Sequence, residues 1–252
     1  MAHFTKLNQT AYPNALECEA QGLEILRDQL KPLADAFIQI PKVHSVSAQE
    51  LVIEEIKSTS ATSQQWYRFG QGLAQLHQIP QHNYGFEVDN YIGLNPQKNM
   101  LSSNWGEFLF EYRLMAQVDF IKDKKIKAEF SNALRQKKSQ LIDFLNQNCQ
   151  HPSLVHGDLW SGNLLFDSDN VWLIDPAVYY GDREVDIAMT EMFGGFSSEF
   201  YQGYDSVYPR SSEYGKKKQI YNLYHFLNHY NLFGGGYLAS CKKLLGEIAS
   251  NL

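Results

Sequence analysis

The chain has 252 residues, of which 44% are hydrophobic and 20% are charged, so it has enough apolar side chains to build a packed core. Its formal net charge of −6 argues against a nucleic-acid or anionic-membrane surface, because both need a basic field. The three cysteines form no C-x-x-C pair, and no run approaches the ~20 apolar residues of a membrane span. We therefore expect a cytoplasmic protein without a disulfide framework, a zinc knuckle, or a nucleic-acid or membrane partner.

The N-terminal region is where strands are expected. Residues 2–7 have the pattern of a strand, and residues 15–30 follow as a helix with apolar positions at helical spacing. Residues 43–46 and 51–56 look like two strands joined by a polar turn. The small polar residues at 58–63 indicate a linker that ends in a helix cap.

The rest of the chain is predicted to be mainly helical. Helices are expected at residues 64–78, 104–122 and 125–149. A β-hairpin then interrupts at residues 164–174, with its polar turn between two apolar runs. Helices return from Glu184 to the end of the chain. The pattern predicts a small strand-bearing region followed by a larger helical region with one inserted hairpin.

The most informative motif is H-x-D-x-x-x-x-N, followed by the apolar hairpin and then by an aspartate. Asp158 and Asn163 precede the hairpin and Asp175 follows it, so the reversal of the chain should bring these side chains together. Phosphoryl transfer needs a carboxylate that accepts the proton of the attacking hydroxyl, and oxygen ligands that hold Mg²⁺ on the phosphates. The same layout occurs in the catalytic loop and metal site of protein kinases. We therefore predict a phosphotransferase that uses ATP and Mg²⁺ and acts on a hydroxyl group.

The residues around this motif give a closer likeness. Residues 154–163 resemble the catalytic loop of the fructosamine kinase (ketosamine-3-kinase) family, and residues 174–189, which begin Ile-Asp-Pro-Ala, are similar to the family as well. Further matches lie at residues 193–196 and 223–229, so the resemblance spans nearly the whole chain. Aminoglycoside and choline kinases share the His, Asp and Asn core, but they usually lack Trp160 together with Asp-Pro-Ala.

The resemblance implies an α+β, bilobal protein-kinase-like fold, with a small N-lobe at residues 1–57 and a larger helical C-lobe at residues 58–252. It also implies transfer of the ATP γ-phosphate to the 3-hydroxyl of a ketosamine, either a small molecule or a sugar adduct on a protein lysine, and hence deglycation repair. In this fold a glycine-rich hairpin precedes the lysine strand. Only five residues precede Lys6, so we expect the N-lobe to lack its first hairpin.

Three residues near the hairpin take their roles from the resemblance. Asp158 matches the general base, and Asn163 and Asp175 match the Mg²⁺ ligands. Trp160 stands where it could form an aromatic wall for the substrate, although a core tryptophan that packs the loop is an equal alternative. Asp186 is expected to anchor the catalytic loop through backbone hydrogen bonds.

The ATP site follows from the resemblance in the same way. Lys6 matches the strand lysine that contacts the α- and β-phosphates, and Glu19 matches the helix glutamate that pairs with this lysine. Without the resemblance, both residues could equally be solvated charges on a strand and a helix. The hinge, whose backbone pairs with adenine, is matched by Glu54, Glu55 and Ile56.

Other polar residues are predicted to have structural roles. His225 and His229 have the i, i+4 spacing of zinc helices, but no third ligand is evident, so satisfied positions in the core or at the rim are favoured. Trp105 and Arg113 are expected to pack within their helix layer. Arg183 is expected to form a structural pair with Glu184, and His156 to bond to the backbone. The glycines at 234–236 are read as a turn between helices.

Two other functions stay open at this stage. One keeps the fold and changes the acceptor to an aminoglycoside, a choline-like compound or another small alcohol. The other is a nucleotide-binding or scaffold protein without turnover, which the short N-lobe motivates. A panel of acceptors separates the first alternative from a ketosamine kinase, and calorimetry with ATP together with a transfer assay separates the second.

Overall fold

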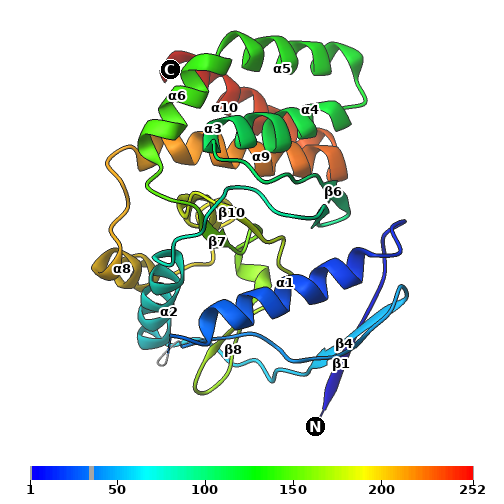
Figure 1. Ribbon diagram of the computed structural model, residues 1–252, viewed down its shortest axis with the longest axis vertical. Coiled ribbons are helices and arrows are strands. Elements are labelled where there is room, and N and C mark those ends of the chain that lie inside the picture. Colours follow the sequence, from blue (N-terminus) through cyan, green and yellow to red (C-terminus); the bar gives the residue numbers. More distant parts are fainter. Residues whose placement is uncertain (1, 34–36, 252) are drawn as a thin grey trace.

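The computed structural model describes residues 2–33 and 37–251, and Figure 1 shows a small sheet and one helix set against a larger helical body. The small sheet is antiparallel in the order β1–β4–β3. Its strands are β1 (His3–Leu7), β4 (Glu50–Glu54) and β3 (Val43–Val46). The helix α1 (Ala15–Leu30) is its neighbour. Leu51 and Ile53 alternate with more exposed residues in β4, as expected when one face of a strand is covered.

The helix α1 is amphipathic, and this determines where it lies. Its buried side chains recur every three or four residues, so they share one face. These are Leu16, Ala20, Leu23, Leu26 and Leu30. Figure 1 shows α1 crossing the molecule beside β4, between the small sheet and the larger body.

The larger body is built from helices. It contains α2 (Ser63–His77), α3 (Trp105–Phe108), α4 (Ala116–Phe120), α5 (Lys124–Gln136), α6 (Lys138–Asn148), α7 (Glu184–Thr190), α8 (Ser198–Val207), α9 (Tyr214–Phe233) and α10 (Leu238–Asn251). A π-helical segment, η1 (Leu109–Met115), joins α3 to α4, and short 3₁₀ turns form η2 (Ser161–Asn163) and η3 (Gly235–Tyr237). Within the described ranges, no helix combines the length and the apolar character needed to cross a bilayer. In Figure 1, α5, α6, α9 and α10 gather at the end of the molecule opposite the N-terminus.

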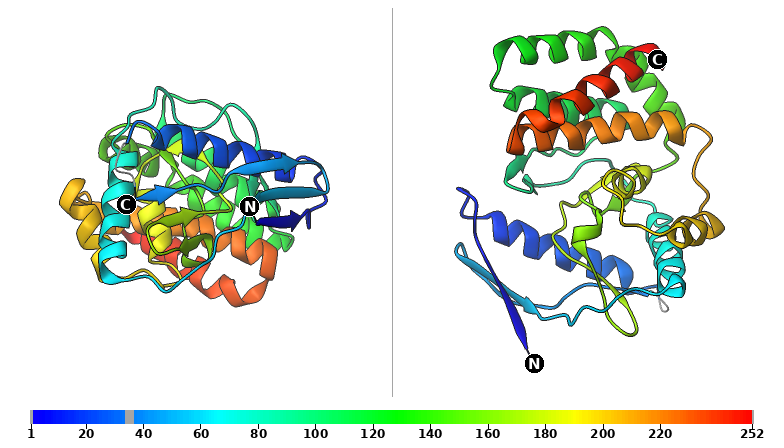
Figure 2. Two further views of the ribbon diagram at one scale, coloured as in Figure 1. Left: turned by 90° about the horizontal axis from the view of Figure 1, so that it is seen from below. Right: turned by 180° about the vertical axis from the view of Figure 1, so that it is seen from behind.

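Short strands position the loops between the two parts. Antiparallel pairs are β7 (Ser153–Val155) with β10 (Tyr179–Gly181), β8 (Leu164–Phe166) with β9 (Val171–Leu173), and β5 (Asn90–Ile92) with β6 (Asn95–Gln97). The strand β2 (Ile38–Gln39) precedes β3 and β4 in the chain. It pairs in parallel with β9 and so attaches to the β8–β9 hairpin. Figure 2 shows this hairpin beside one end of α1 and next to α2.

The start of α2 is fixed by a capping box. The Thr62 hydroxyl accepts from the Gln65 amide at 3.2 Å, and the Gln65 side chain accepts from the Thr62 amide at 3.0 Å. The Gln65 side chain also donates to the carbonyl of Asp167 in the β8–β9 turn at 2.8 Å. The cap expected at residues 58–63 is therefore confirmed, and it also ties the hairpin to α2.

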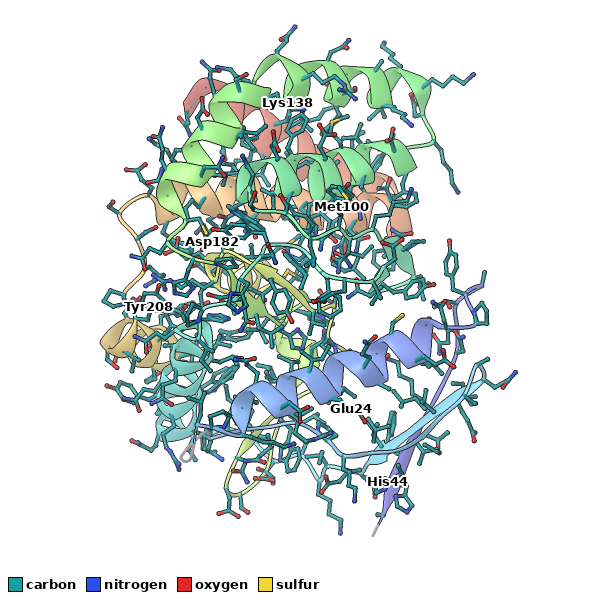
Figure 3. All side chains as sticks on the ribbon, viewed as in Figure 1. Glu24, His44, Met100, Lys138, Asp182 and Tyr208 are labelled. Atoms are coloured by element: carbon teal, nitrogen blue, oxygen red, sulfur yellow. The ribbon has the colours of Figure 1, made fainter. Side chains whose placement is uncertain are left out.

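Some predicted helices and strands agree with the structure and others do not. The helix predicted at 15–30 has the observed bounds, but the single helix predicted at 125–149 is wrong. The chain leaves helical geometry at Lys137, with φ −102° and ψ 3°, and α6 begins there. The strands β2, β5, β6, β7 and β10 were not predicted, because two or three residues carry no readable alternation. Figure 3 shows that side chains fill the interior of the small sheet-and-helix part and of the larger helical body.

The packing of α2 against α8 gives a direct test. The two helices approach so closely that a Cβ added at Gly203 would lie 2.0 Å from the carbonyl oxygen of Tyr67. We expect Gly203→Ala to lower the free energy of unfolding by about 2 kcal/mol, as overpacked cores do. The measurement is urea denaturation followed by circular dichroism. The control is Gly215→Ala in α9, where an added Cβ meets nothing within 4 Å, and equal effects of the two changes would contradict this packing.

Candidate active site

A cleft of about 620 Å³ lies where the small sheet, α1, the loops around the hairpin and the end of α9 meet. It brings together most of the residues that the sequence assigned to catalysis. Those that line it are Lys6, Glu19, Asp158, Trp160, Asn163 and Asp175. The described lining does not include Glu54, Glu55 or Ile56.

The catalytic loop is held by one buried carboxylate. Asp186 in α7 is fully buried and accepts hydrogen bonds from the amides of His156 at 2.7 Å and Gly157 at 2.9 Å. His77 adds a contact to the same carboxylate at 3.3 Å. Burial by itself raises the pKa of Asp186, but the His77 hydrogen bond and nearby histidines outweigh it and lower the pKa. The loop-anchoring role expected for Asp186 is confirmed.

The loop is also joined to the segment that follows the hairpin. The Ala177 amide donates to the carbonyl of His156 at 2.9 Å, and a His156 ring nitrogen contacts the carbonyl of Ile174 at 3.0 Å. Gly157 has φ 81°, and a Cβ there would lie 2.1 Å from the Ala177 carbonyl oxygen, so only glycine fits. Asp175 also has a positive φ, 53°, which is uncommon for a residue with a side chain. This constrained junction places Asp175 in the same cleft as Asp158.

Asp158 is positioned by Asn163. The Asn163 side-chain nitrogen donates to the Asp158 carbonyl at 2.8 Å and to its carboxylate at 3.3 Å. Burial raises the pKa of Asp158 to about 7, although the Asn163 hydrogen bond opposes this shift. A carboxyl group with such a pKa can take up and release a proton near neutral pH.

Lys6 bridges the small sheet to the loop after the hairpin. Its ammonium lies 2.8 Å from a carboxylate oxygen of Glu19 in α1 and 2.8 Å from a carboxylate oxygen of Asp175. Burial lowers the pKa of Lys6, but the charges of Glu19 and Asp175 outweigh burial and raise it. Burial raises the pKa of Glu19 to about 7 against the opposing effect of Lys6. The Lys6–Glu19 ion pair that the sequence resemblance implies is therefore present in the structure.

Asn163 and Asp175 fit a divalent cation that is shared with phosphates. Asn163 uses its side-chain nitrogen toward Asp158, which leaves its side-chain oxygen as a possible ligand. The Asp175 side chain is 43% exposed, so one of its oxygens can face a ligand in the cleft. Across the described ranges, no group of three His, Cys, Asp or Glu side chains converges as a metal site. This donor set suits a hard cation that takes its other ligands from phosphates and water.

The segment matched to the hinge lies at the end of β4. Glu54 pairs with His3 across the sheet, and the Glu55 amide donates to the carbonyl of Ala2 at 3.2 Å. Ile56 follows the last paired residue and is partly buried. The structure thus places Glu54 at the end of the strand that pairs with the Lys6 strand and the other two residues just after it, outside the described lining of the cleft.

Trp160 is not a core residue. Its side chain is 38% exposed and lines the cleft. A Cβ added at Gly162 would lie 2.2 Å from the indole, so the ring lies directly against that glycine. Of the two alternatives that the sequence allowed for Trp160, packing in the core is excluded, and a position on the cleft wall is observed.

The two histidines of α9 have different environments. His225 is fully buried, and neither ring nitrogen has a hydrogen-bond partner within the described structure. Burial lowers the pKa of His225 to about 3, so the ring is neutral. The prediction that it is a satisfied core residue is wrong in this respect. His229 contacts the His225 carbonyl through a ring nitrogen at 2.8 Å and lines the cleft, as predicted for a rim residue.

The remaining structural predictions are confirmed. Trp105 and Arg113 are buried, and the Arg113 guanidinium lies 4.1 Å from the centre of the Tyr179 ring. Arg183 and Glu184 are both buried, with a shortest charged contact of 3.5 Å. Their roles are in packing and not in the cleft.

Sequence reasoning missed the β5–β6 hairpin and the end of α9 as parts of the cleft. Asn90 donates to the Val178 carbonyl at 2.8 Å, and Gln97 donates to the Ala177 carbonyl at 3.1 Å, which joins β5 and β6 to the segment after Asp175. The two residues between these strands include Gly93, but strands of three residues carry too little alternation for the sequence to indicate a hairpin. No local signal indicated that the end of α9 would reach the same cleft.

Comparisons with a family model and with individual known proteins point to the same family. Residues 1–251 match the family model described as fructosamine kinase. A protein of Synechocystis sp. named probable ketoamine kinase is 41% identical over 251 residues, which cover 97% of this chain and 82% of the relative. The chloroplastic protein-ribulosamine 3-kinase of Arabidopsis thaliana is 36% identical over 255 residues, which cover 97% of this chain and 75% of the relative.

Solved structures agree with the fold. A structure from Thermobifida fusca, named as a candidate fructosamine-3-kinase, has a TM-score of 0.86 and 27% identity, with 99% of this chain and 86% of that chain covered. The APH(2″)-IIa ternary complex with streptomycin and ATP has a TM-score of 0.63 and 16% identity, with 97% and 84% covered, and supports the fold alone. The predicted α+β, bilobal protein-kinase-like fold is confirmed.

The raised pKa of Asp158 predicts a pH-dependent cost to stability. Between its usual value of 3.8 and about 7, Asp158 is charged in the unfolded chain and protonated in the folded chain. The native state then binds more protons, so the stability contributed at this position falls as pH rises through that window. We expect the melting temperature of Asp158→Asn, measured in EDTA, to rise relative to that of the unchanged protein from pH 4 to pH 7. A difference that stays constant with pH would contradict the raised pKa.

Proposed function

Because the chain belongs to the fructosamine kinase family, we propose that this phosphotransferase moves the γ-phosphate of ATP to the 3-hydroxyl of a ketosamine. A ketosamine is the adduct of a sugar with an amine, and deglycation follows from phosphorylating it. The observation that carries the proposal is the convergence of Asp158, Asn163, Asp175 and the Lys6–Glu19 ion pair in one cleft. Kinase chemistry needs this set and little more.

Asp158 is the proposed general base. Its carboxylate takes the proton of the 3-hydroxyl as the new bond forms between that oxygen and the γ-phosphorus, while the bond from the γ-phosphorus to the ADP oxygen breaks. The pKa of about 7 that burial gives Asp158 is close to working pH, where a base is most effective. Asn163 holds the carboxylate in place through its side-chain nitrogen.

The phosphates are proposed to lie near Lys6. Lys6, held by Glu19, is the only lysine or arginine in the described lining of the cleft, so its ammonium is suited to contact the α- and β-phosphates. The enzyme uses a nucleotide and a divalent cation, and we propose that the cation is Mg²⁺, held by Asn163 and Asp175. Mg²⁺ neutralises phosphate charge when bound. Asp175, which bonds to Lys6 here, would then be shared between the two cations.

The boundary between the lobes is also part of the proposal. We place the N-lobe at residues 1–57 and the C-lobe at residues 58–252. Where they join, we propose that adenine is bound by backbone groups of Glu54, Glu55 and Ile56 other than the Glu54 and Glu55 amides, which donate to Lys42 and Ala2. Residues 57–62 lack regular structure and lead from β4 into α2, which supports a hinge there. The parallel pairing of β2 with β9 gives the lobes a second connection.

The acceptor is proposed to be a ketosamine, either free or on a protein lysine. The Arabidopsis relative is named for protein-ribulosamine, and the Synechocystis relative for ketoamine. An aminoglycoside or choline acceptor is not favoured by any observation in the cleft, because similarity to those kinases concerns the fold alone. The alternative of a nucleotide-binding protein without turnover is distinguished from a kinase by the turnover assay of the unchanged protein, described next with Asp158→Asn.

The role of Asp158 is tested by Asp158→Asn. With ATP, Mg²⁺ and the fructose adduct of an amine, we expect turnover to fall by at least about 100-fold, because the base is lost while the shape is kept. Phosphorus NMR measures the product, and calorimetry checks that ATP still binds. Asp169→Asn is the matched control, since Asp169 is an exposed residue of the β8–β9 turn. Undiminished turnover of Asp158→Asn would remove the base role, and absent turnover in the unchanged protein would contradict the kinase function.

The nucleotide site is tested by Glu19→Gln. Loss of the charged partner of Lys6 should raise the KM for ATP by about tenfold, since a hydrogen-bonded ion pair contributes roughly 1.5–3 kcal/mol. The control is Glu24→Gln on the same helix, where the side chain is exposed and is labelled in Figure 3. If both variants keep the KM of the unchanged protein, the Lys6–Glu19 pair does not serve ATP.

A further inference from the structure

A continuous row of aromatic rings leads from the catalytic loop to the end of α9. The Trp160 and Phe193 ring centres are 6.3 Å apart, those of Phe193 and His229 are 4.9 Å apart, and those of His229 and Phe233 are 5.6 Å apart. Tyr237 closes the row at 6.1 Å from Phe233. We call these residues the aromatic band. Trp160, His229 and Phe233 line the cleft, so the band continues from the proposed reaction centre.

The band is not explained by core packing. Phe233 is 65% exposed, and Phe193 is 41% exposed, although both are large apolar side chains. In the described part of the chain, no lysine or arginine stacks on the rings of Trp160, Phe193 or Phe233, although other aromatic rings of the protein are covered in this way. His229 and Tyr237, which connect these rings, are partly buried. A contiguous set of exposed and partly exposed aromatic rings beside a catalytic cleft indicates a binding surface.

The chemistry of the proposed substrate indicates which part would lie there. In a ketosamine the reacting oxygen is on C3, and the amine nitrogen is on C1, about 4 Å from C3 by ordinary bond lengths. A 3-hydroxyl at Asp158 therefore keeps the amine and its substituent within the cleft that Trp160 also lines. The rest of the sugar is a polyol, whereas the substituent is a carbon chain on a basic nitrogen. Aromatic faces bind carbon chains and ammonium groups, and they match the substituent better than the polyol.

We infer that the aromatic band is the subsite for the substituent on the ketosamine nitrogen, with the ammonium beside Trp160 and the alkyl chain lying on the rings of Phe193, Phe233 and Tyr237. This inference rests on the proposed function, since it takes the 3-hydroxyl at Asp158 as its starting point. The occupant is an extended alkylamine, such as the side chain of a lysine.

Two glycines at the outer end of the band support an acceptor that is larger than a free amine. Gly235 and Gly236 begin η3, which ends at Tyr237. Neither has a positive φ, and a Cβ added at either would meet nothing within 4 Å, so the fold does not require glycine there. Because these two residues have no side chains, the outer end of the band is sterically open. A lysine that projects from a protein surface can therefore reach it.

The subsite is tested by Phe233→Ala with two acceptors, the fructose adducts of methylamine and of Nα-hippuryl-lysine. We expect the KM for the lysine adduct to rise about tenfold, which is the loss of one desolvated aromatic contact, while kcat and the KM for the methylamine adduct stay unchanged. Phe233→Tyr should keep the KM of the unchanged protein, because the ring is retained. The control is Phe120→Ala, since Phe120 is 37% exposed on α4 and lies outside the described lining of the cleft. Equal changes for both adducts, or no change for either, would overturn the subsite.

A binding measurement keeps this test separate from the proposed function. Calorimetry of the lysine adduct with Asp158→Asn, alone and combined with Phe233→Ala, needs no turnover. Weaker binding in the double variant supports the subsite even if the unchanged protein phosphorylates neither adduct, a result that would remove the proposed function alone. Equal affinity in the two variants overturns the subsite.

The open end of the band is tested by Gly236→Leu. We expect a several-fold lower rate with a ribose-treated protein such as lysozyme, and an unchanged rate with the methylamine adduct, because only a bulky acceptor meets the new side chain. Gly246→Leu in α10 is the matched control, as an added Cβ there also meets nothing within 4 Å. If Gly236→Leu and Gly246→Leu give the same rate with the protein acceptor, this end of the band does not receive macromolecules.

Discussion

The arrangement of the cleft depends on the two hydrogen bonds that the buried carboxylate of Asp186 accepts from the amides of His156 and Gly157. A buried anion is costly unless it is satisfied, and here two amides and His77 satisfy it. In return, the loop leading to Asp158 cannot shift without leaving a buried charge unpaired. Asp158, the proposed general base, is thus positioned by a residue of α7 that is not part of the described lining of the cleft.

The second constraint is the bridge through Lys6. One ammonium pairs with Glu19 in α1 and with Asp175 after the hairpin, so it connects the small sheet, its helix and the C-lobe. Asp175 adopts a left-handed backbone conformation to be there, and the neighbouring segment is held by the Ala177–His156 hydrogen bond. Strain of this kind persists only where the surroundings enforce it. The same residues that fix the backbone therefore set the electrostatics in which Asp158 and Glu19 titrate near neutral pH.

Much of this could be predicted from the sequence where a feature is local. The helix at 15–30 has regular apolar spacing, and the hairpin after Asn163 has a polar turn between apolar runs, so both were found. The convergence of Asp158, Asn163 and Asp175 followed from the reversal of the hairpin.

Features that arise from tertiary packing could not be predicted. The strands of two or three residues exist because neighbouring segments pair with them, and Lys137 breaks a helix that the apolar pattern alone would continue. Among the described residues, the His225 ring has no hydrogen-bond partner, which no spacing rule anticipates. The aromatic band joins Trp160, Phe193 and Phe233 from three distant parts of the chain, and only the packing of α9 brings them together.

We propose that this cleft directs phosphate to one hydroxyl of a sugar adduct. The most direct measurement is two-dimensional phosphorus–proton NMR of the product formed by the unchanged protein from ATP, Mg²⁺ and a fructosamine. We expect a single new phosphate whose phosphorus couples to the proton on C3. A phosphate coupled to the protons of any other carbon, or no phosphorylated product under these conditions, would contradict it.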